Sequence, residues 1–458
     1  MNAETGQVSA KHRVGGKVKK AWPRVGAPPK TRLGKWLARQ VGPVKPCGRK
    51  KVAGSRAKRR KANQRRRKCL RWHKRIRVQA RTATTSDGGD PGAPATATRN
   101  LQASVAAAKT DPVLLARSYQ IPKDDPDYDR LLNWSFTYDS AVTASAFISL
   151  GDKDQAVQIL DQLTALQFNT GAIDIAFNVV SGSGTGLYRS GNTAWLGLAA
   201  TTFDQRFSSS RYLQAARRSA EFLIGLQAKN GLIKGGPGIG WSSTLHNLIA
   251  YTFFTRLAAE DKSNSEQYAS VADEIAAGID SNLLVEDKTG LHFLQGLNDS
   301  VDALDTQAIG ALYLLGRGED RAASEVVDRI PKEFGVKNQR IRLSDKPSSY
   351  NQTWSSKEKF AGFKPYASNQ APDVIWFEGT AEVRAATAAT GGSVKEMDAE
   401  SKEWRAVTAS GASAAPLQSN ETITDTKEDL DVEYHVWPAA AAAGWWILAA
   451  NEPTFLVP

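Results

Sequence analysis

Residues 137–167 read TYDSAVTASAFISLGDKDQAVQILDQLTALQ, two stretches of helical length on either side of Gly151-Asp152. The first stretch is small and apolar on nearly every face, which is typical of a helix buried on all sides. The second has a single apolar stripe, which is typical of an outer helix. That stripe consists of Ala156, Val157, Leu160, Leu163 and Leu166. The pair predicts a helical hairpin with an inner and an outer member.

The same arrangement recurs along the chain. A polar, aromatic-flanked opening precedes an alanine-rich stretch six times, at intervals of about 53 to 72 residues. The openings are Thr137-Tyr138-Asp139, Gly191-Asn192-Thr193, Thr244-Leu245-His246-Asn247, Ala303-Leu304-Asp305-Thr306, Trp376-Phe377-Glu378-Gly379-Thr380 and His435-Val436-Trp437-Pro438. Later inner helices are expected at 192–204, 246–259, 305–316, 379–390 and 439–450, and outer helices at 211–228, 265–282, 319–332 and 394–407. Segment 110–119 is expected to be the outer partner of the last inner helix.

Repeats of this length usually represent one supersecondary unit stacked on its copies. Strand signals are confined to short connecting pieces such as Ile173–Val180, which favours an all-α fold. Helical pairs also build open solenoids. We favour a closed (α/α)6 toroid, because the count is six and polar groups collect at the same end of every inner helix. All six openings would then form one rim.

Charge divides the chain into two parts. Sixty Lys and Arg stand against 47 Asp and Glu, for a total of +13. Residues 1–86 contain 28 of the basic residues and a single acid, Glu4, so they carry +27 and the remainder carries −14. We interpret residues 1–86 as a disordered basic arm, 87–105 as a flexible linker and 106–458 as the toroid domain.

Three interpretations of the basic arm remain open. It is Arg-rich and acid-poor like an organelle-targeting peptide, it matches a nuclear-localisation or nucleic-acid-binding segment with an anionic partner, or it has no role. The compartment is therefore not predicted. No secretory signal and no run of 18 apolar residues is seen, so no membrane span is expected. A domain with a net charge of −14 repels phosphate groups, so nucleic acid is not an expected partner of the toroid.

Cofactors and metals are not expected. Both cysteines, Cys47 and Cys69, lie in the arm, which excludes disulfides and cysteine chemistry from the domain. Phosphate loops, dinucleotide fingerprints and the HExxH motif are absent from the sequence. The acidic run at 124–129 lacks the ligand spacing of a calcium loop and predicts a solvated turn. We expect a monomeric domain.

The rim has the properties of a sugar-binding surface. Helix N-termini present unpaired N–H groups and a dipole that favours anions and hydroxyl oxygens. Tryptophans lie beside most openings, and a flat apolar ring next to polar groups suits a sugar; half-buried core tryptophans are the alternative. The candidate substrate-binding residues are Tyr138, Asn192, Trp195, Trp241, His246, Asn247, Trp376, His435 and Trp437.

The candidate catalytic residues are the carboxylates at the openings, Asp139, Asp305 and Glu378. Glycoside hydrolysis needs two carboxyl groups, one protonated and one ionised. Apolar neighbours such as Phe377 are expected to raise the pKa of Glu378 toward that of a general acid. Asp139 and Asp305 are expected to stay ionised, since helix N-termini favour the anion. Ordinary helix capping explains both aspartates equally well.

Taken together, these motifs resemble the six-hairpin glycosidase-like proteins, which have an (α/α)6 barrel. The resemblance covers most of residues 130–455 and includes Arg189-Ser190-Gly191-Asn192-Thr193-Ala194-Trp195 and Trp241-Ser242-Ser243-Thr244-Leu245-His246-Asn247. It implies a carbohydrate ligand in a cleft at the inner-helix N-termini. The chain departs from the group at Leu245, where a Glu often precedes the His-Asn pair.

Three functions follow from this resemblance. One is a glycoside hydrolase with Glu378 as acid and Asp139 or Asp305 as base. A second is a toroidal polysaccharide lyase or sugar epimerase, in which Tyr138, His246 and His435 would move a proton and Asn247 would steady a carboxylate. A third is a catalytically inactive carbohydrate-binding ring, consistent with Leu245.

The division of the chain can be tested by truncation. A chain that begins near residue 100 should fold alone as a helical monomer, because the arm has no apolar pattern to contribute to a core. Its melting temperature, measured by circular dichroism, should match that of the full chain. A large decrease on removing residues 1–86 would show that the arm packs on the domain.

Overall fold

The structure is a computed structural model. It describes residues 113–123, 125–341, 359–367, 370–401, 405–407, 413–425 and 432–458, and the two short strands β1 (Arg13–Val14) and β2 (Lys17–Val18), which pair with each other. Apart from these strands, the predicted basic arm (1–86) and linker (87–105) lie outside the described residues.

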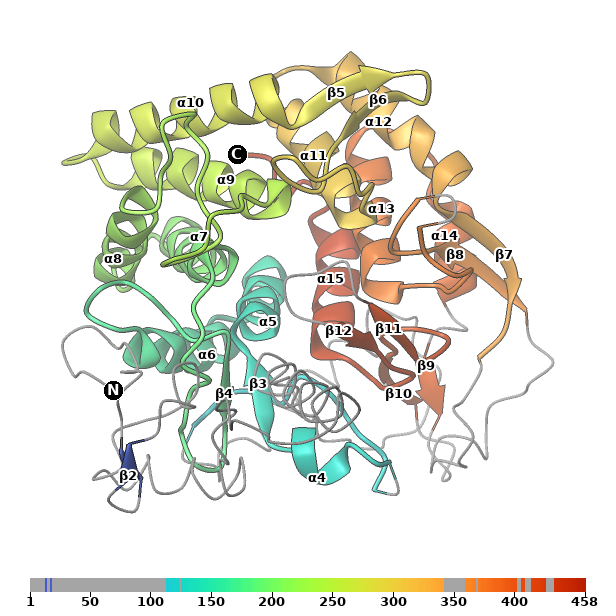
Figure 1. Cartoon of the computed structure of the whole chain (residues 1–458), viewed down its shortest axis with the longest axis horizontal. Coiled ribbons are helices and arrows are strands. Elements are labelled where there is room, and N and C mark those ends of the chain that lie inside the picture. The colour runs from blue at the N-terminus through green and yellow to red at the C-terminus, as the bar shows by residue number, and fades with distance from the viewer. Residues whose placement is uncertain are drawn as a thin grey trace, which may run out of the picture.

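Six of the described helices form an inner ring (Figure 1). They are α5 (Thr137–Leu150), α7 (Ser190–Arg206), α9 (Thr244–Glu260), α11 (Leu304–Gly316), α13 (Phe377–Ala389) and α15 (Ala440–Asn451). Each packs against the next, and α15 packs against α5, so the ring is closed. The prediction of an all-α toroid is confirmed.

Outer helices cover this ring. They are α6 (Lys153–Leu166), α8 (Leu213–Ile224), α10 (Ser265–Asn282), α12 (Asp320–Glu333) and the short α14 (Lys395–Glu400). The first four follow their inner partners closely in sequence, and α6 buries Ala156, Ile159, Leu160 and Leu163 as one stripe. Gly151 ends α5 with a φ of 74°, a left-handed conformation in which a side chain would be strained. The inner–outer alternation read from the sequence is therefore confirmed for these hairpins.

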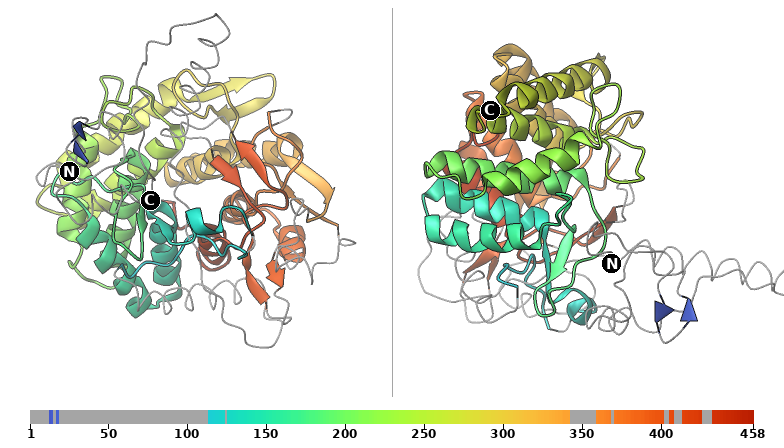
Figure 2. Two further views of the ribbon diagram at one scale, coloured as in Figure 1. Left: turned by 60° about the horizontal axis from the view of Figure 1, so that its bottom comes forward. Right: turned by 90° about the vertical axis from the view of Figure 1, so that its left-hand side faces the viewer.

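The remaining elements are short and lie in the connections. The helix α4 spans Tyr128–Leu131. Antiparallel two-stranded pairs are formed by β3 (Trp134–Phe136) with β4 (Ala176–Asn178), β5 (Leu284–Asp287) with β6 (Gly290–Phe293), β7 (Gly335–Gln339) with β8 (Phe360–Phe363), β9 (Arg405–Val407) with β10 (Ser413–Pro416), and β11 (Ile423–Asp425) with β12 (Val432–Tyr434). In the right-hand view of Figure 2, the long connections of the first hairpins project from one end of the helices.

Two predicted elements were wrong. The outer helix expected at 394–407 stops at Glu400, and residues 405–407 form β9. The Ser401 hydroxyl bonds back to the carbonyl of Asp398 at that point, a local bond that competes with continued helix. Segment 110–119 was expected to be an outer helix, but its described part, 113–119, has no helix. Its residues instead bond to other segments, with Tyr119 paired to Ala439 in an antiparallel bridge.

One backbone bond recurs around the ring. The first residue of every inner helix donates its N–H to a carbonyl in the segment that leads to the next inner helix. These bonds are Thr137 to Ile175 (3.0 Å), Ser190 to Gly235 (3.0 Å), Thr244 to Gln295 (2.9 Å), Leu304 to Pro365 (2.9 Å), Phe377 to Gln418 (3.0 Å) and Ala440 to Ser118 (2.8 Å). Such N–H groups have no partner within their own helix. The sixth bond joins the last repeat to the segment before the first.

Side chains of the first helical turn reinforce this arrangement. Asn247 is fully buried, and its amide holds the backbone N–H of Ile233 (2.7 Å), the carbonyl of Ile233 (3.1 Å) and the carbonyl of Ser243 (2.7 Å). Gln307 holds Phe293 in the same way: its Oε1 accepts the Phe293 N–H at 2.9 Å, and its Nε2 donates to the Phe293 carbonyl at 2.7 Å.

Among the described helices, none is both long and apolar enough to cross a membrane.

Replacement of Asn247 by Ala should therefore destabilise the fold. It leaves the buried N–H and carbonyl of Ile233 without their side-chain partner, at a cost of about 2–4 kcal/mol. Urea unfolding monitored by circular dichroism measures this loss. Asn192→Ala is the matched control, because Asn192 is half-buried at the start of α7 and should cost less than about 1 kcal/mol. Equal losses in the two variants would contradict the clamping role of Asn247.

Candidate active site

The carboxyl groups of the openings gather at the N-terminal ends of α5, α11 and α13. Glu378 is the second residue of α13, Asp305 the second of α11 and Asp139 the third of α5. The charges of Asp139 and Asp305 both act on the pKa of Glu378, so the three groups form one electrostatic cluster. We call Asp139, Asp305 and Glu378 the carboxyl cluster.

A chain of hydrogen bonds holds Glu378 in place. The Tyr138 hydroxyl donates to Oε1 of Glu378 at 2.6 Å. The indole Nε1 of Trp445 on α15 donates to the Tyr138 oxygen at 2.7 Å. The Trp195 ring packs edge-on against both Tyr138 (5.5 Å between centroids) and Trp445 (5.9 Å). Three inner helices and an aromatic cluster therefore fix the orientation of one carboxyl group.

Glu378 favours its protonated form. Burial raises the pKa of Glu378 well above its ordinary value, the hydrogen bond from Tyr138 lowers it in part, and the negative charges of Asp139 and Asp305 raise it further. Only 7% of the residue is exposed. A carboxylic acid in this setting keeps its proton near neutral pH and is able to act as a general acid.

Glu382 is a further buried acid that the sequence interpretation missed. It follows Glu378 by one helical turn on α13 and is 2% exposed, and its Oε2 has no hydrogen-bond partner among the described residues. Burial, with the charges of Asp305 and Glu378, raises the pKa of Glu382 well above its ordinary value. Its i, i+4 spacing from Glu378, which places both carboxyl groups on one face of the helix, was the available signal.

The protonation state of Asp139 differs from the one predicted from the sequence. It was expected to be ionised at the helix N-terminus, but burial raises its pKa from the ordinary 3.8 to about 7, and the hydrogen bond from Ser118 only partly offsets this. Desolvation outweighs the helix dipole because the residue is 6% exposed. Asp305 is half-buried, and its Oδ1 accepts the Thr306 N–H at 2.6 Å.

The two histidines of the rim have separate surroundings. The Nδ1 of His246 lies 2.9 Å from the Ser190 hydroxyl, and its ring lies 5.6 Å from that of Trp241. The ring fits closely over Gly191, where a Cβ atom would come within 2.5 Å of it. His435 is buried and stacks on Trp437, with the ring planes 2° apart and the centroids 3.6 Å apart.

The predicted tryptophan rim divides into two kinds of residue. Trp195, Trp376 and Trp437 are 2%, 8% and 3% exposed, which favours the alternative that they are core residues. Trp241 is half-buried, and the guanidinium of Arg189 lies 6.0 Å from its ring. Of these four, Trp241 is the one with the surface to stack on a ligand. Asn192 is half-buried on the same rim, whereas the Asn247 amide is committed to the backbone described above.

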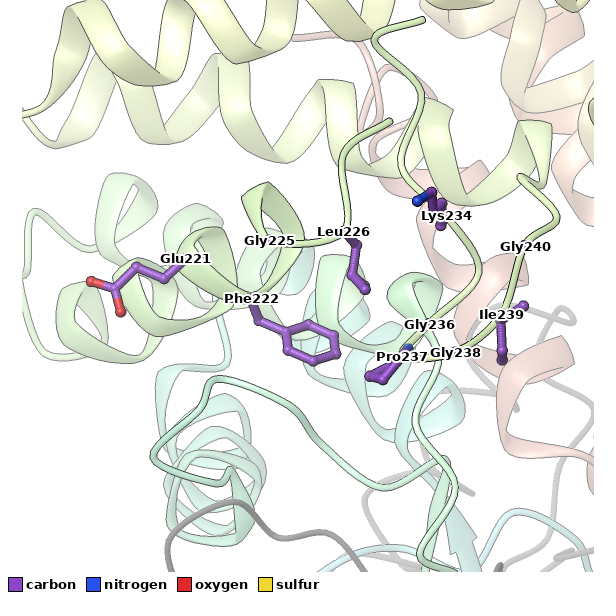
Figure 3. Close-up of a pocket in the computed structure, with 10 residues that line it drawn as sticks. All are labelled: Glu221, Phe222, Gly225, Leu226, Lys234, Gly236, Pro237, Gly238, Ile239 and Gly240. Carbon is purple, nitrogen blue, oxygen red and sulfur yellow. The ribbon is translucent and has the colours of Figure 1, made fainter. Parts of the chain in front are cut away.

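A cavity of about 650 Å³ lies near Trp241 but outside the carboxyl cluster (Figure 3). It is formed between the C-terminal end of α8 and the glycine-rich loop 234–240. Phe222 and Leu226 line one wall, and Pro237 and Ile239 line the other. Because this loop runs directly into Trp241, the cavity lies close to the third opening.

The fold is shared with solved carbohydrate-related structures. A wild-type glycosidase matches with a TM-score of 0.53 at 12% identity, covering 81% of this chain and 100% of its own. A D-mannose isomerase matches with a TM-score of 0.53 at 13% identity, covering 81% of this chain and 99% of its own. An α-amylase from Clostridium perfringens matches with a TM-score of 0.51 at 9% identity, covering 78% of this chain and 96% of its own. No protein-family profile and no curated protein sequence matches the chain. At these identities the comparisons establish a shared helical toroid fold and no activity.

The raised pKa of Asp139 predicts how stability depends on pH. Below about pH 4 the carboxyl group is protonated in the folded and unfolded chains alike. Between about pH 4 and 7 only the folded chain keeps the proton, so this group's contribution to stability is lost as pH rises and stays lost above pH 7. Asp139→Asn should therefore stabilise the protein by roughly 1–3 kcal/mol at pH 8 and much less at pH 4.

Urea unfolding at the two pH values measures this difference. Asp154→Asn, at an exposed acid on α6, is the control and should change stability equally little at both. A loss of stability in Asp139→Asn at pH 8 would mean that the folded protein depends on the ionised form.

Proposed function

We propose that this chain is a carbohydrate-active enzyme that hydrolyses glycosidic bonds of an oligo- or polysaccharide, with Glu378 as the general acid. The observation that carries the proposal is the setting of Glu378, a buried carboxyl group that accepts a hydrogen bond from Tyr138 and lies within electrostatic range of Asp139 and Asp305. Glycosidic oxygen is a poor leaving group unless it receives a proton, and a carboxyl group that is protonated at neutral pH supplies it.

Asp305 is the proposed partner carboxylate. It is half-buried, whereas Asp139 is 6% exposed and has its pKa raised to about 7. The Thr306 N–H and hydroxyl hold Oδ1 of Asp305, at 2.6 and 3.2 Å, which fixes the carboxylate at the start of α11. Asp305 would activate water or attack the anomeric carbon, and its negative charge would also help keep Glu378 protonated.

Substrate contacts are assigned to the more accessible part of the rim. Trp241 would stack on a sugar ring, and Asn192 and His246 on neighbouring helices would contact its hydroxyl groups. The names of the glycosidase and the α-amylase with this fold are consistent with a carbohydrate substrate. Because one fold hosts many activities, the proposal depends on the carboxyl cluster and not on this likeness.

The alternative of a lyase or epimerase is less well supported. It would need Tyr138 as a base, but burial and the charges of Glu378 and Glu382 raise the pKa of Tyr138 well above its ordinary value. It would also need Asn247 to hold a substrate carboxylate, and that amide already binds the backbone of Ile233 and Ser243. The proposed hydrolysis requires neither Tyr138 as a base nor Asn247 as a ligand of the substrate.

Substitution of Glu378 by Gln tests the acid directly. On a substrate with a poor leaving group, such as an unmodified oligosaccharide, turnover should fall by roughly 10²–10⁴-fold. On an aryl glycoside with a good leaving group, which needs no proton, the loss should be far smaller. Glu266→Gln, at an exposed position on α10 away from the carboxyl cluster and the cavity, is the matched control and should leave both rates unchanged.

The outcomes separate the three hypotheses. Equal losses on both substrates would give Glu378 a role in binding or folding and not in proton donation. A wild-type protein that is retained on a polysaccharide matrix but cleaves no linkage would favour the inactive carbohydrate-binding ring. In that case Leu245→Glu, which restores the acid that often precedes the His-Asn pair in the resembling group, is the variant to assay.

A further inference from the structure

A second polar cluster lies where the two ends of the ring meet. Asp127, the residue before α4, comes from the N-terminal side of the ring, whereas Glu433 on β12 and His435 come from the C-terminal side. The Trp437 indole N–H donates to Oδ2 of Asp125 at 3.0 Å, which ties the same two segments together. Residues about 300 positions apart in sequence are therefore held side by side.

The side chains of this cluster converge on one point. Asp127, Glu433 and His435 each offer one ligand atom, and the three atoms all lie within 4.8 Å of one another. Nε2 of His435 is 3.6 Å from Oε2 of Glu433. Two ligands of one tetrahedral zinc ion are separated by about 3.4 Å when each bond is about 2.0–2.1 Å long. The spacing of the imidazole and the carboxylate therefore suits a shared ion.

His435 provides an independent indication of a ligand. The residue is 4% exposed, and within the described part of the chain its Nε2 has no hydrogen-bond partner. Its ring cannot easily turn away, because it is stacked on Trp437 with the planes 2° apart. A buried imidazole nitrogen without a partner is costly, and a metal ion would satisfy it.

We propose that Asp127, Glu433 and His435 bind a divalent transition-metal ion, Zn²⁺ in particular, at the junction of the first and last repeats. One imidazole nitrogen and two carboxylate oxygens are donors that zinc accepts, whereas Ca²⁺ takes oxygen ligands. This site is separate from the carboxyl cluster and does not depend on the proposed hydrolysis. The ion would fasten the closure of the ring, because its ligands come from both sides of it.

Arg130 is the competing cation at this site. Its Nη2 lies 2.6 Å from Oδ1 of Asp127 and 3.8 Å from Oε2 of Glu433. The Arg130 side chain is 43% exposed, and exposed ion pairs contribute little to stability, so a metal ion can displace it. This competition provides a test. If the site binds a metal ion, removing the Arg130 guanidinium should increase the affinity for zinc. If the residues form only an ion-pair network, its removal should not increase that affinity.

The experiment uses the full chain with Cys47 and Cys69 replaced by Ser, since thiols would bind zinc themselves. Titration calorimetry with ZnCl₂ should show one site, and zinc at a hundredfold excess over its Kd should raise the melting temperature by about 3–4 °C. The same concentration of CaCl₂ should give no shift. Arg130→Gln should increase the zinc affinity.

Ligand variants complete the test. His435→Ala and Asp127→Asn should each weaken zinc binding by at least the roughly 10–100-fold that the loss of an outer partner costs a metal site. Asp127 is partly exposed, so its variant should fold even if His435→Ala does not. His292→Ala removes another buried histidine, whose Nδ1 lies 2.9 Å from the Gly290 carbonyl, and should leave binding unchanged. Undiminished zinc binding in Asp127→Asn, or a wild-type protein that binds no zinc, would overturn the proposal.

Discussion

The structure depends on satisfying the backbone at the start of each inner helix. A buried helix N-terminus leaves N–H groups that its own turns cannot pair. Here the first N–H of each inner helix bonds to the segment leading to the next inner helix, and the bond from Ala440 to Ser118 completes the circle. This repeated bond brings the six openings to one end of the ring. Everything proposed for the carboxyl cluster requires that common end.

The six repeats are equivalent in backbone but not in chemistry. At the second position of the inner helices, α5, α11 and α13 carry Tyr138, Asp305 and Glu378, whereas α7, α9 and α15 carry Gly191, Leu245 and Ala441. Three of the six inner helices therefore carry a polar side chain at this position, and the other three carry a small or apolar one. Leu245 is one of the apolar ones, and it is half-buried against the main core. A buried carboxyl group is costly to ionise, and the fold sustains several of them.

The sequence predicted the helices because burial on all faces and burial on one stripe give different patterns, as in residues 137–150 and 153–166. It also placed Glu378 among apolar neighbours. The sequence could not predict how deeply each carboxyl group is buried in the closed ring. Asp139 has the sequence signature of a cap but is desolvated, and Glu382 looked like an ordinary helix residue. The extended closing segment, 113–119, was missed because its backbone partners are distant in sequence.

The bond from Ala440 to Ser118 also has a consequence for how the chain acquires its structure. The last inner helix packs directly on the first, with Gly444 so close to Val142 that a Cβ atom would lie 2.8 Å from its methyl group. This seam joins residues about 300 positions apart in sequence, and contacts of such long separation raise the contact order and slow folding. Until α15 has been synthesised, the first inner helix lacks this neighbour, and transiently exposed apolar surface of that kind makes a folding chain prone to aggregation.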